Sequence, residues 1–105
     1  MSNLNGTYKS GNATLTISNA NDSNGTFVGK LTESNVNYDV NGHYHFENSV
    51  GPNTVIAFIA KNDSSGYQAR ALFSKDLAFR TLKDAGGLSA FNGQVSNVQG
   101  EFIRV

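Results

Sequence analysis

Apolar and polar residues alternate strictly in several short segments of this chain. From Ala13 to Ile17 every second residue is apolar, and the same pattern runs from Tyr38 to Phe46. Successive side chains of a β-strand point to opposite faces, so each segment has one face suited to a core and one suited to water. Clusters of Gly, Asn, Asp and Ser separate the segments about every 8–12 residues, as in barrels and sandwiches. The sequence therefore predicts an all-β fold.

The length of 105 residues is enough for one domain with a single core, which we assign to residues 1–105. Only 15% of the residues are charged, and the polar remainder is rich in Asn, Ser and Thr rather than in helix formers. The formal net charge is zero. We therefore expect no nucleic-acid partner, and the lack of charge repulsion favours a homo-oligomer.

The chain contains no cysteine, which excludes disulfides, thiolate metal sites and thiol nucleophiles. No apolar run approaches the roughly 18 residues of a membrane-spanning helix, so no membrane partner is expected. The first residues show neither the basic nor the apolar region of a signal peptide. We expect a soluble protein that is either cytoplasmic or secreted with its signal removed, and the sequence leaves the compartment open.

Turn signals divide the chain into eight expected strands, at residues 6–9, 13–17, 27–31, 38–46, 54–60, 67–73, 77–82 and 98–105. A longer loop is expected over residues 86–93. Asn41-Gly42 is a strong hairpin signal inside the fourth strand. The unbroken alternation on both sides equally fits one long strand that bends at the glycine, which we favour because an eight-stranded barrel needs it.

The fifth expected strand is apolar at every position from Val55 to Ala60. One set of its side chains must point away from the barrel, because alternate residues face opposite sides. In a one-layered barrel only another subunit or a loop can cover that outer set. The pattern therefore predicts a homo-oligomer, a dimer or tetramer, held by this strand. A covering loop over residues 86–91 is the competing interpretation.

Several motifs resemble the avidin–streptavidin family in their order and spacing. They are the opening Leu4-Asn5-Gly6-Thr7-Tyr8, the segment Gly25-Thr26-Phe27-Val28-Gly29, the segment Asn41-Gly42-His43-Tyr44, the apolar stretch from Thr54 to Lys61 and the closing stretch from Gly100 to Val105. The resemblance implies an eight-stranded antiparallel up-and-down β-barrel, avidin-like or calycin-like. Other calycin barrels, such as the lipocalins, are the main rival.

The resemblance also implies where biotin would bind, and the residues there differ from the family. Ala13, Leu31, Ala60 and Gly100 stand where the family has a serine, a tyrosine, a tryptophan and an aspartate or asparagine. Each lost hydrogen-bond partner of a buried ligand costs about 1–3 kcal/mol, so tight biotin binding is not expected. The candidate ligand-binding residues that the resemblance leaves at the barrel mouth are Ser10, Leu31, Ser65, Tyr67, Phe79 and Phe91.

The first functional interpretation is a non-catalytic binding barrel whose small-molecule ligand is unknown, with no cofactor. The alternatives are an oligomerising interaction domain with a filled barrel and a lectin-like module. A hydrolase triad would draw on Asp39 and His43, but the sequence has no nucleophile elbow. We therefore predict no enzyme activity.

Two pairs of basic side chains remain to be placed. His43 and His45 alternate with aromatic residues, which favours a polar strand face over a metal site, so we predict that neither is a metal ligand. Arg70 and Arg80 lie on strands expected to be adjacent, where they would face each other. Surface ion pairs with acidic residues are favoured over joint binding of an anionic ligand.

Overall fold

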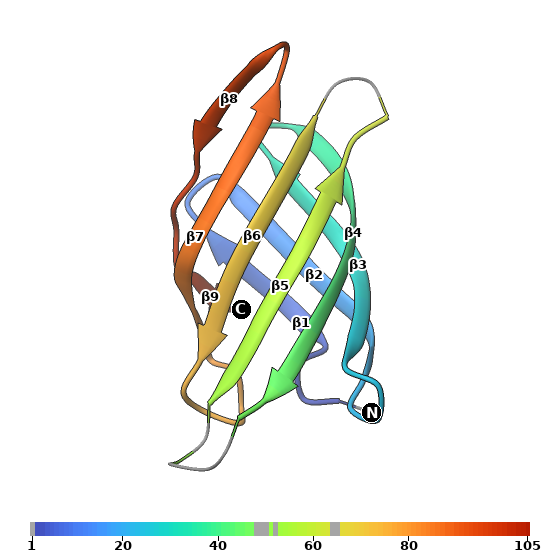
Figure 1. The fold of residues 1–105 in the computed structure, drawn as a ribbon, viewed down its shortest axis with the longest axis vertical. Helices are drawn as coiled ribbons and strands as arrows, with labels where there is room; N and C mark the ends of the chain where they lie inside the picture. Colours follow the sequence, from blue (N-terminus) through green and yellow to red (C-terminus); the bar gives the residue numbers. More distant parts are fainter. Residues whose placement is uncertain (1, 48–50, 52, 64–65) are drawn as a thin grey trace.

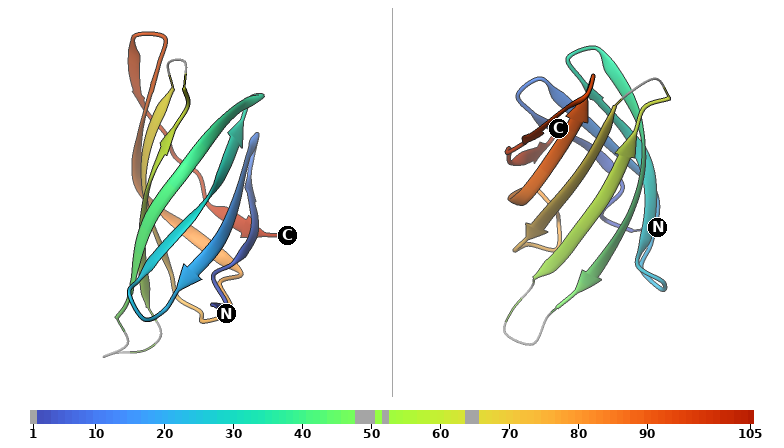
Figure 2. Two further views of the ribbon diagram at one scale, coloured as in Figure 1. Left: turned by 90° about the vertical axis from the view of Figure 1, so that its right-hand side faces the viewer. Right: turned by 45° about the horizontal axis from the view of Figure 1, so that its top comes forward.

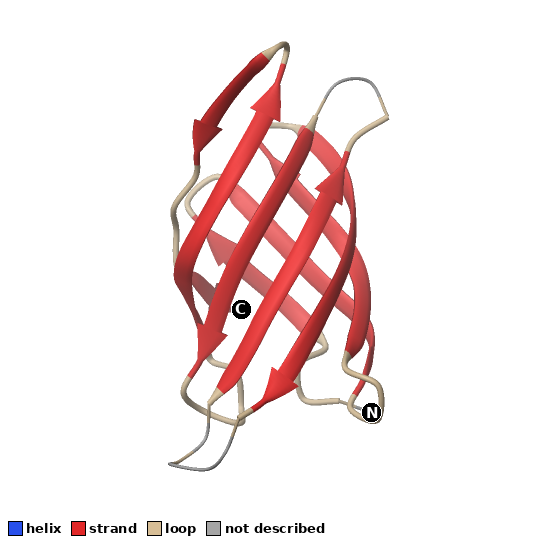
Figure 3. Ribbon diagram, in the orientation of Figure 1, coloured by secondary structure: helices blue, strands red, loops and turns tan. Residues whose placement is uncertain are grey.

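The computed structural model describes residues 2–47, 51, 53–63 and 66–105, and the regular elements in them are all β-strands (Figures 1 and 3). The strands are β1 (Gly6–Ser10), β2 (Ala13–Asn21), β3 (Thr26–Glu33), β4 (Val36–Phe46), β5 (Thr54–Lys61), β6 (Tyr67–Ser74), β7 (Thr81–Phe91), β8 (Gln94–Asn97) and β9 (Phe102–Arg104). None of the described residues belongs to a helix that is long and apolar enough to cross a membrane.

Eight of these strands form a closed ring. Consecutive strands from β1 to β7 pair antiparallel, and β9 lies between β7 and β1, pairing with both. The expected eight-stranded antiparallel up-and-down barrel is confirmed. β8 is an additional strand, bonded to the end of β7 outside the ring, and Figure 2 shows the β7–β8 hairpin extending beyond the other strands.

β4 runs as one strand through Asn41-Gly42, as favoured from the sequence. Gly42 faces the barrel interior opposite Phe27 on β3. A methyl group on Gly42 would overlap the Phe27 ring and would lie 2.8 Å from the Ala57 carbonyl oxygen. The glycine is therefore needed as space for an aromatic ring rather than as a turn residue.

The predictions for the last third of the chain were partly wrong. The strand predicted over residues 77–82 is wrong for residues 77–80. The Asp76 carboxylate accepts a hydrogen bond from the Ala78 amide at 2.9 Å and organises a turn there, and β7 starts only at Thr81. Residues 86–93 are not a loop, because β7 continues to Phe91 and turns into β8. Within residues 98–105 only β9 is a strand, and residues 98–101 are an irregular connection between β8 and β9.

Phe79 explains why that turn looks like a strand in the sequence. Its side chain is 1% exposed and its ring centroid lies 6.4 Å from that of Phe46 at one end of the barrel. Its backbone has φ 52°, a left-handed conformation rather than the extended one of a regular strand. Leu77 and Phe79 thus alternate because Phe79 closes the barrel end, not because the chain is extended.

Aromatic and aliphatic side chains fill the barrel along its axis. The Phe27 ring contacts Tyr44 and Phe58, with centroid separations of 6.1 and 6.5 Å. The largest fully buried side chains include Tyr8, Phe79, Phe102, Leu4, Leu15, Ile17, Leu31, Ile56, Leu72 and Leu82. The apolar positions of the alternating sequence segments therefore supply the side chains of this buried core.

Candidate functional site

The outer face of β4, β5, β6 and β7 exposes apolar side chains. On β5 the side chains of Ile56, Phe58 and Ala60 point into the barrel, so Val55 and Ile59 point outward. Val55 is 55% exposed and Ile59 is 37% exposed. The run that is apolar at every position from Val55 to Ala60 therefore buries only one of its two faces within a single chain.

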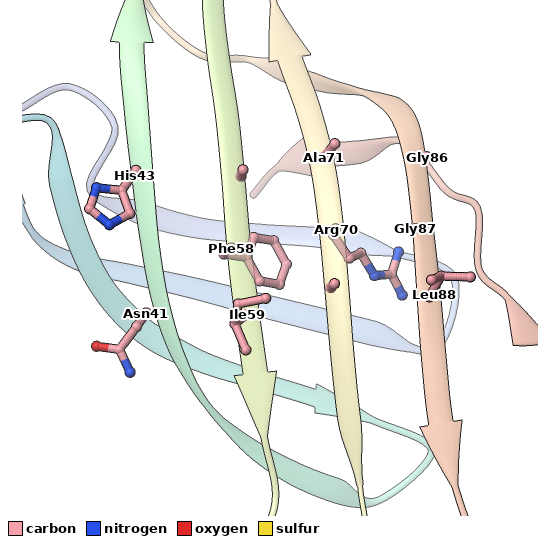
Figure 4. Close-up of a pocket in the computed structure, with 11 residues that line it drawn as sticks. Asn41, His43, Phe58, Ile59, Arg70, Ala71, Gly86, Gly87 and Leu88 are labelled. Atoms are coloured by element: carbon pink, nitrogen blue, oxygen red, sulfur yellow. The ribbon is translucent and has the colours of Figure 1, made fainter. Parts of the chain in front are cut away.

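Strand register arranges the outward residues in two rows across the four strands. One row consists of His43, Ala57, Ala71 and Gly86, and the next consists of Asn41, Ile59, Ala69 and Leu88. These residues line a shallow hollow of about 420 Å³, shown in Figure 4. We call this surface the outer hollow. It is hollow because alanine and glycine occupy the middle of the four-stranded surface.

The outer hollow is bordered by charged residues. The next outward row toward the end of β5 contains Asp39 and Lys61. The next outward row toward the start of β5 contains His45 and Lys83. Among the described residues lining the hollow, Arg70 is the only charged one, and its side chain belongs to the barrel interior. The surface therefore joins an uncharged centre to a polar rim, the composition common in protein–protein contacts.

A second cluster lies inside the barrel at its mouth, the end where β1, β3 and β5 finish. The Gln68 side-chain amide donates a hydrogen bond to Glu33 at 2.5 Å, and Arg70 Nε donates to Gln68 Oε1 at 3.0 Å. Arg70 Nη2 also lies 3.4 Å from Glu33 Oε2. The three side chains bridge β3 and β6 and occupy the interior of the mouth.

Burial dominates the electrostatics of this cluster. The Arg70 residue is 4% exposed, and loss of solvent lowers the pKa of its guanidinium, which the carboxylates of Glu33 and Asp84 partly offset. The guanidinium carbon stands 5.2 Å from the Phe102 ring centroid, a cation–π contact. The predicted surface ion pair of Arg70 was therefore wrong, because the side chain points into the barrel.

Sequence reasoning missed Glu33 and Gln68. A signal for Gln68 was present, since it alternates with Arg70 and Leu72 and so shares the face of a buried leucine. Arg80 does not face Arg70 as expected: it precedes β7, in the turn, where its Nε lies 3.9 Å from the Asp76 carboxylate. The error followed directly from extending a strand over residues 77–82.

The structure separates the candidate ligand-binding residues. Leu31 is fully buried in the core near the mouth, and Ser10 is half-buried beside Gly100, where a methyl group would overlap the serine hydroxyl. Tyr67 starts β6 and is 44% exposed. The remaining members are Phe91, half-buried at the end of β7, Phe79, at the opposite end of the barrel, and Ser65, outside the described residues.

His43 and His45 both lie on the outer face of β4. His45 Nε2 stands 3.5 Å from the Glu47 carboxylate, with both side chains well exposed. His43 lines the outer hollow between Asn41 and Ala57. Within the described part of the chain, no three His, Cys, Asp or Glu side chains come close enough together to hold a metal ion.

The geometry defines a class of protein: a small, closed up-and-down barrel with a filled interior and an exposed apolar surface on one side. No protein-family model, no curated protein and no solved structure matches the chain. The barrel fold accordingly rests on the strand pairing itself.

Proposed function

We propose that this domain is a divergent avidin-like barrel without catalytic activity, and that it functions by binding a second copy of itself through the outer hollow. The carrying observation is the exposed apolar face of β5, with Val55 and Ile59 in water, next to Ala69, Ala71 and Leu88. Covering a half-exposed Val, Ile or Leu contributes about 1 kcal/mol. The avidin-like assignment draws its support from the motif spacing and the up-and-down strand order.

The charge distribution favours a second copy as the partner. In a two-fold contact each surface meets itself, so equal charges would face each other across the axis. Among the described residues, the outward side chains of the outer hollow include no Asp, Glu, Lys or Arg. Two such surfaces can therefore approach without repulsion, while the charged rows stay at the rim.

The available area sets the expected strength of the contact. Eight-residue strands such as β5 are about 27 Å long, and four of them about 4.8 Å apart cover roughly 500 Å². Two copies would bury about 1,000 Å², the lower limit of specific interfaces. We therefore expect a micromolar rather than a nanomolar dimer.

The filled barrel supports this proposal over a ligand held in the mouth. Leu31 and Gln68 are fully buried and Arg70 nearly so, and the polar atoms of Gln68 and Arg70 are engaged with each other. A ligand entering there would have to break the hydrogen bonds of Gln68 and separate Arg70 from Glu33. The outer hollow offers an apolar surface at no such cost.

Light scattering tests the proposal with three charge substitutions. At high micromolar concentration the wild type should have twice the single-chain mass of 11.2 kDa. Ala57→Glu, in the outer hollow, should give a folded monomer, since burying two unpaired carboxylates opposes association. Ile103→Glu, at an exposed apolar position on the outer face of β9, is the matched control and should remain a dimer.

The third substitution separates the two faces of one strand. Ile56→Glu places the charge inside the barrel beside Ala57 and should unfold the domain rather than dissociate it. A wild-type mass of 11.2 kDa at high micromolar concentration would overturn self-association. If Ile103→Glu dissociates the dimer and Ala57→Glu does not, the contact lies on another surface of the barrel.

A further inference from the structure

His43 is the titratable side chain that points outward from the first row of the outer hollow. It pairs with Thr26 on β3 and with Ala57 on β5, and the row continues through Ala71 to Gly86. Figure 4 shows its imidazole at the β4 side of the hollow, and the residue is exposed between the buried Gly42 and Tyr44. Its immediate cross-strand neighbours therefore have no charge to offer it.

The charged groups around His43 are all engaged or remote from it. On β4 itself, Asp39 is paired with Lys30 of β3, and His45 is paired with Glu47. On the sheet beyond, Lys61 and Lys83 occupy the bordering rows, and Lys83 is paired with the Glu101 carboxylate.

Arg70, behind the hollow, is bound to Glu33. Among the described residues that line the hollow, no carboxylate faces outward. A second copy docked by the same surface brings the same side chains and hence no carboxylate of its own.

We infer that His43 makes self-association through the outer hollow depend on pH, with the dimer favoured when the imidazole is neutral. This inference rests on the proposed self-association. Histidine changes its charge between about pH 5 and 8, so acidification turns His43 into a cation at this surface. In the monomer water solvates that cation, but in the dimer it is buried without a partner, which is costly.

The direction of the effect follows from proton counting. If the dimer opposes protonation of His43, two separate chains bind more protons than one dimer at mildly acid pH. Association must then weaken as the pH falls. Because the dimer contains two copies of His43, we expect its Kd to rise about tenfold or more between about pH 8 and about pH 5.5.

Sedimentation equilibrium of the full chain at these two pH values tests the inference, with circular dichroism to confirm that the barrel stays folded. The readout is the ratio of the Kd at the acid pH to the Kd at the alkaline pH. We expect a ratio of about ten or more for the wild type and near one for His43→Gln, which cannot titrate. His45→Gln is the matched control: it removes a histidine two residues away, outside the hollow, and should keep the wild-type ratio.

The outcomes separate the two proposals. A wild-type dimer whose Kd is equal at both pH values would overturn the role of His43 and leave self-association intact. A ratio that stays high in His43→Gln, or that collapses in His45→Gln, would also overturn it. A folded monomer at both pH values would overturn self-association and the pH effect together. His43→Lys, a permanent cation, should have the raised Kd already at the alkaline pH, and a wild-type Kd there would overturn the role of His43.

Discussion

Arg70 on β6 and Glu33 on β3 meet across the inside of the barrel, with Nη2 and Oε2 3.4 Å apart, although the two residues are 37 positions apart in the chain. Gln68 completes the contact by binding both. The Arg70 side chain is 2% exposed, whereas that of Glu33 is 30% exposed. The carboxylate thus offsets a cation that has lost nearly all its solvent.

Glu33→Gln should destabilise the domain by about 1–3 kcal/mol, because it leaves the buried Arg70 cation without its counterion. The partial exposure of Glu33 keeps the expected loss below that of a fully buried pair. Urea unfolding measures the free energy of unfolding. Asp39→Asn is the control, since it breaks the exposed Lys30–Asp39 pair and should cost less than about 1 kcal/mol. Equal losses for the two variants would contradict the structural importance of the mouth cluster.

Biotin should produce no binding heat in titration calorimetry. Ala13 and Leu31 are each at most 2% exposed, and they present only apolar groups where the resemblance to the avidin family implies hydrogen-bond partners for a buried urea. The adjoining mouth holds the Glu33–Gln68–Arg70 contacts in place of a cavity. Sub-micromolar affinity would contradict this interpretation of the interior.

The features that could be predicted from the sequence are those that depend on the alternation of apolar and polar side chains along a strand. Strict alternation identified β2 and β4, and the uninterrupted apolar run of β5 indicated that this strand has an outward apolar face. Successive side chains of a strand point to opposite faces, and the hydrophobic effect determines that the apolar face is buried. These two rules do not require knowledge of distant partners.

The features that could not be predicted depend on tertiary contacts. Leu77 and Phe79 alternate like strand residues, yet the chain forms a turn there. The turn is held by the hydrogen bond from the Ala78 amide to Asp76 and by burial of the Phe79 side chain at the barrel end. β8 is exposed at all four positions, so no apolar pattern marks it. The partnership of Arg70 with Glu33 also lies beyond any local pattern, because the barrel closure brings the two strands together.

Gly42→Ala should destabilise the barrel by about 1–3 kcal/mol or more, since the new methyl group has to displace the Phe27 ring and meets the rigid Ala57 carbonyl. Thermal and urea unfolding measure the loss. Val28→Ala, at an exposed position of the neighbouring strand, is the control and should change stability by less than about 1 kcal/mol. A neutral Gly42→Ala variant would mean that β4 and β5 can separate to admit the methyl group.

Tyr44→Phe should raise the pKa of Asp22 toward its ordinary value of 3.8. The Tyr44 hydroxyl donates a hydrogen bond to the Asp22 carboxylate at 2.6 Å, and this bond, followed by one from Ser2, holds the pKa of that carboxyl below 3.8. A folded-state pKa below the unfolded value means that the unfolded chain binds more protons. The contribution to stability is therefore present above about pH 4 and is lost as the pH falls through the folded pKa.

Two measurements test this expected dependence of stability on pH. Carboxyl NMR titration should show a higher Asp22 pKa in Tyr44→Phe, and urea unfolding should show a smaller loss of stability between about pH 7 and about pH 3 than in the wild type. The effect should be modest, a few tenths to about 1 kcal/mol, because Asp22 is exposed to water. Tyr8→Phe is the control: it removes another phenol hydroxyl, one that donates to the Leu4 carbonyl at 2.6 Å, and should leave the pKa of Asp22 where it is. An unchanged Asp22 pKa in Tyr44→Phe would show that the hydrogen bond does not control this carboxyl in solution.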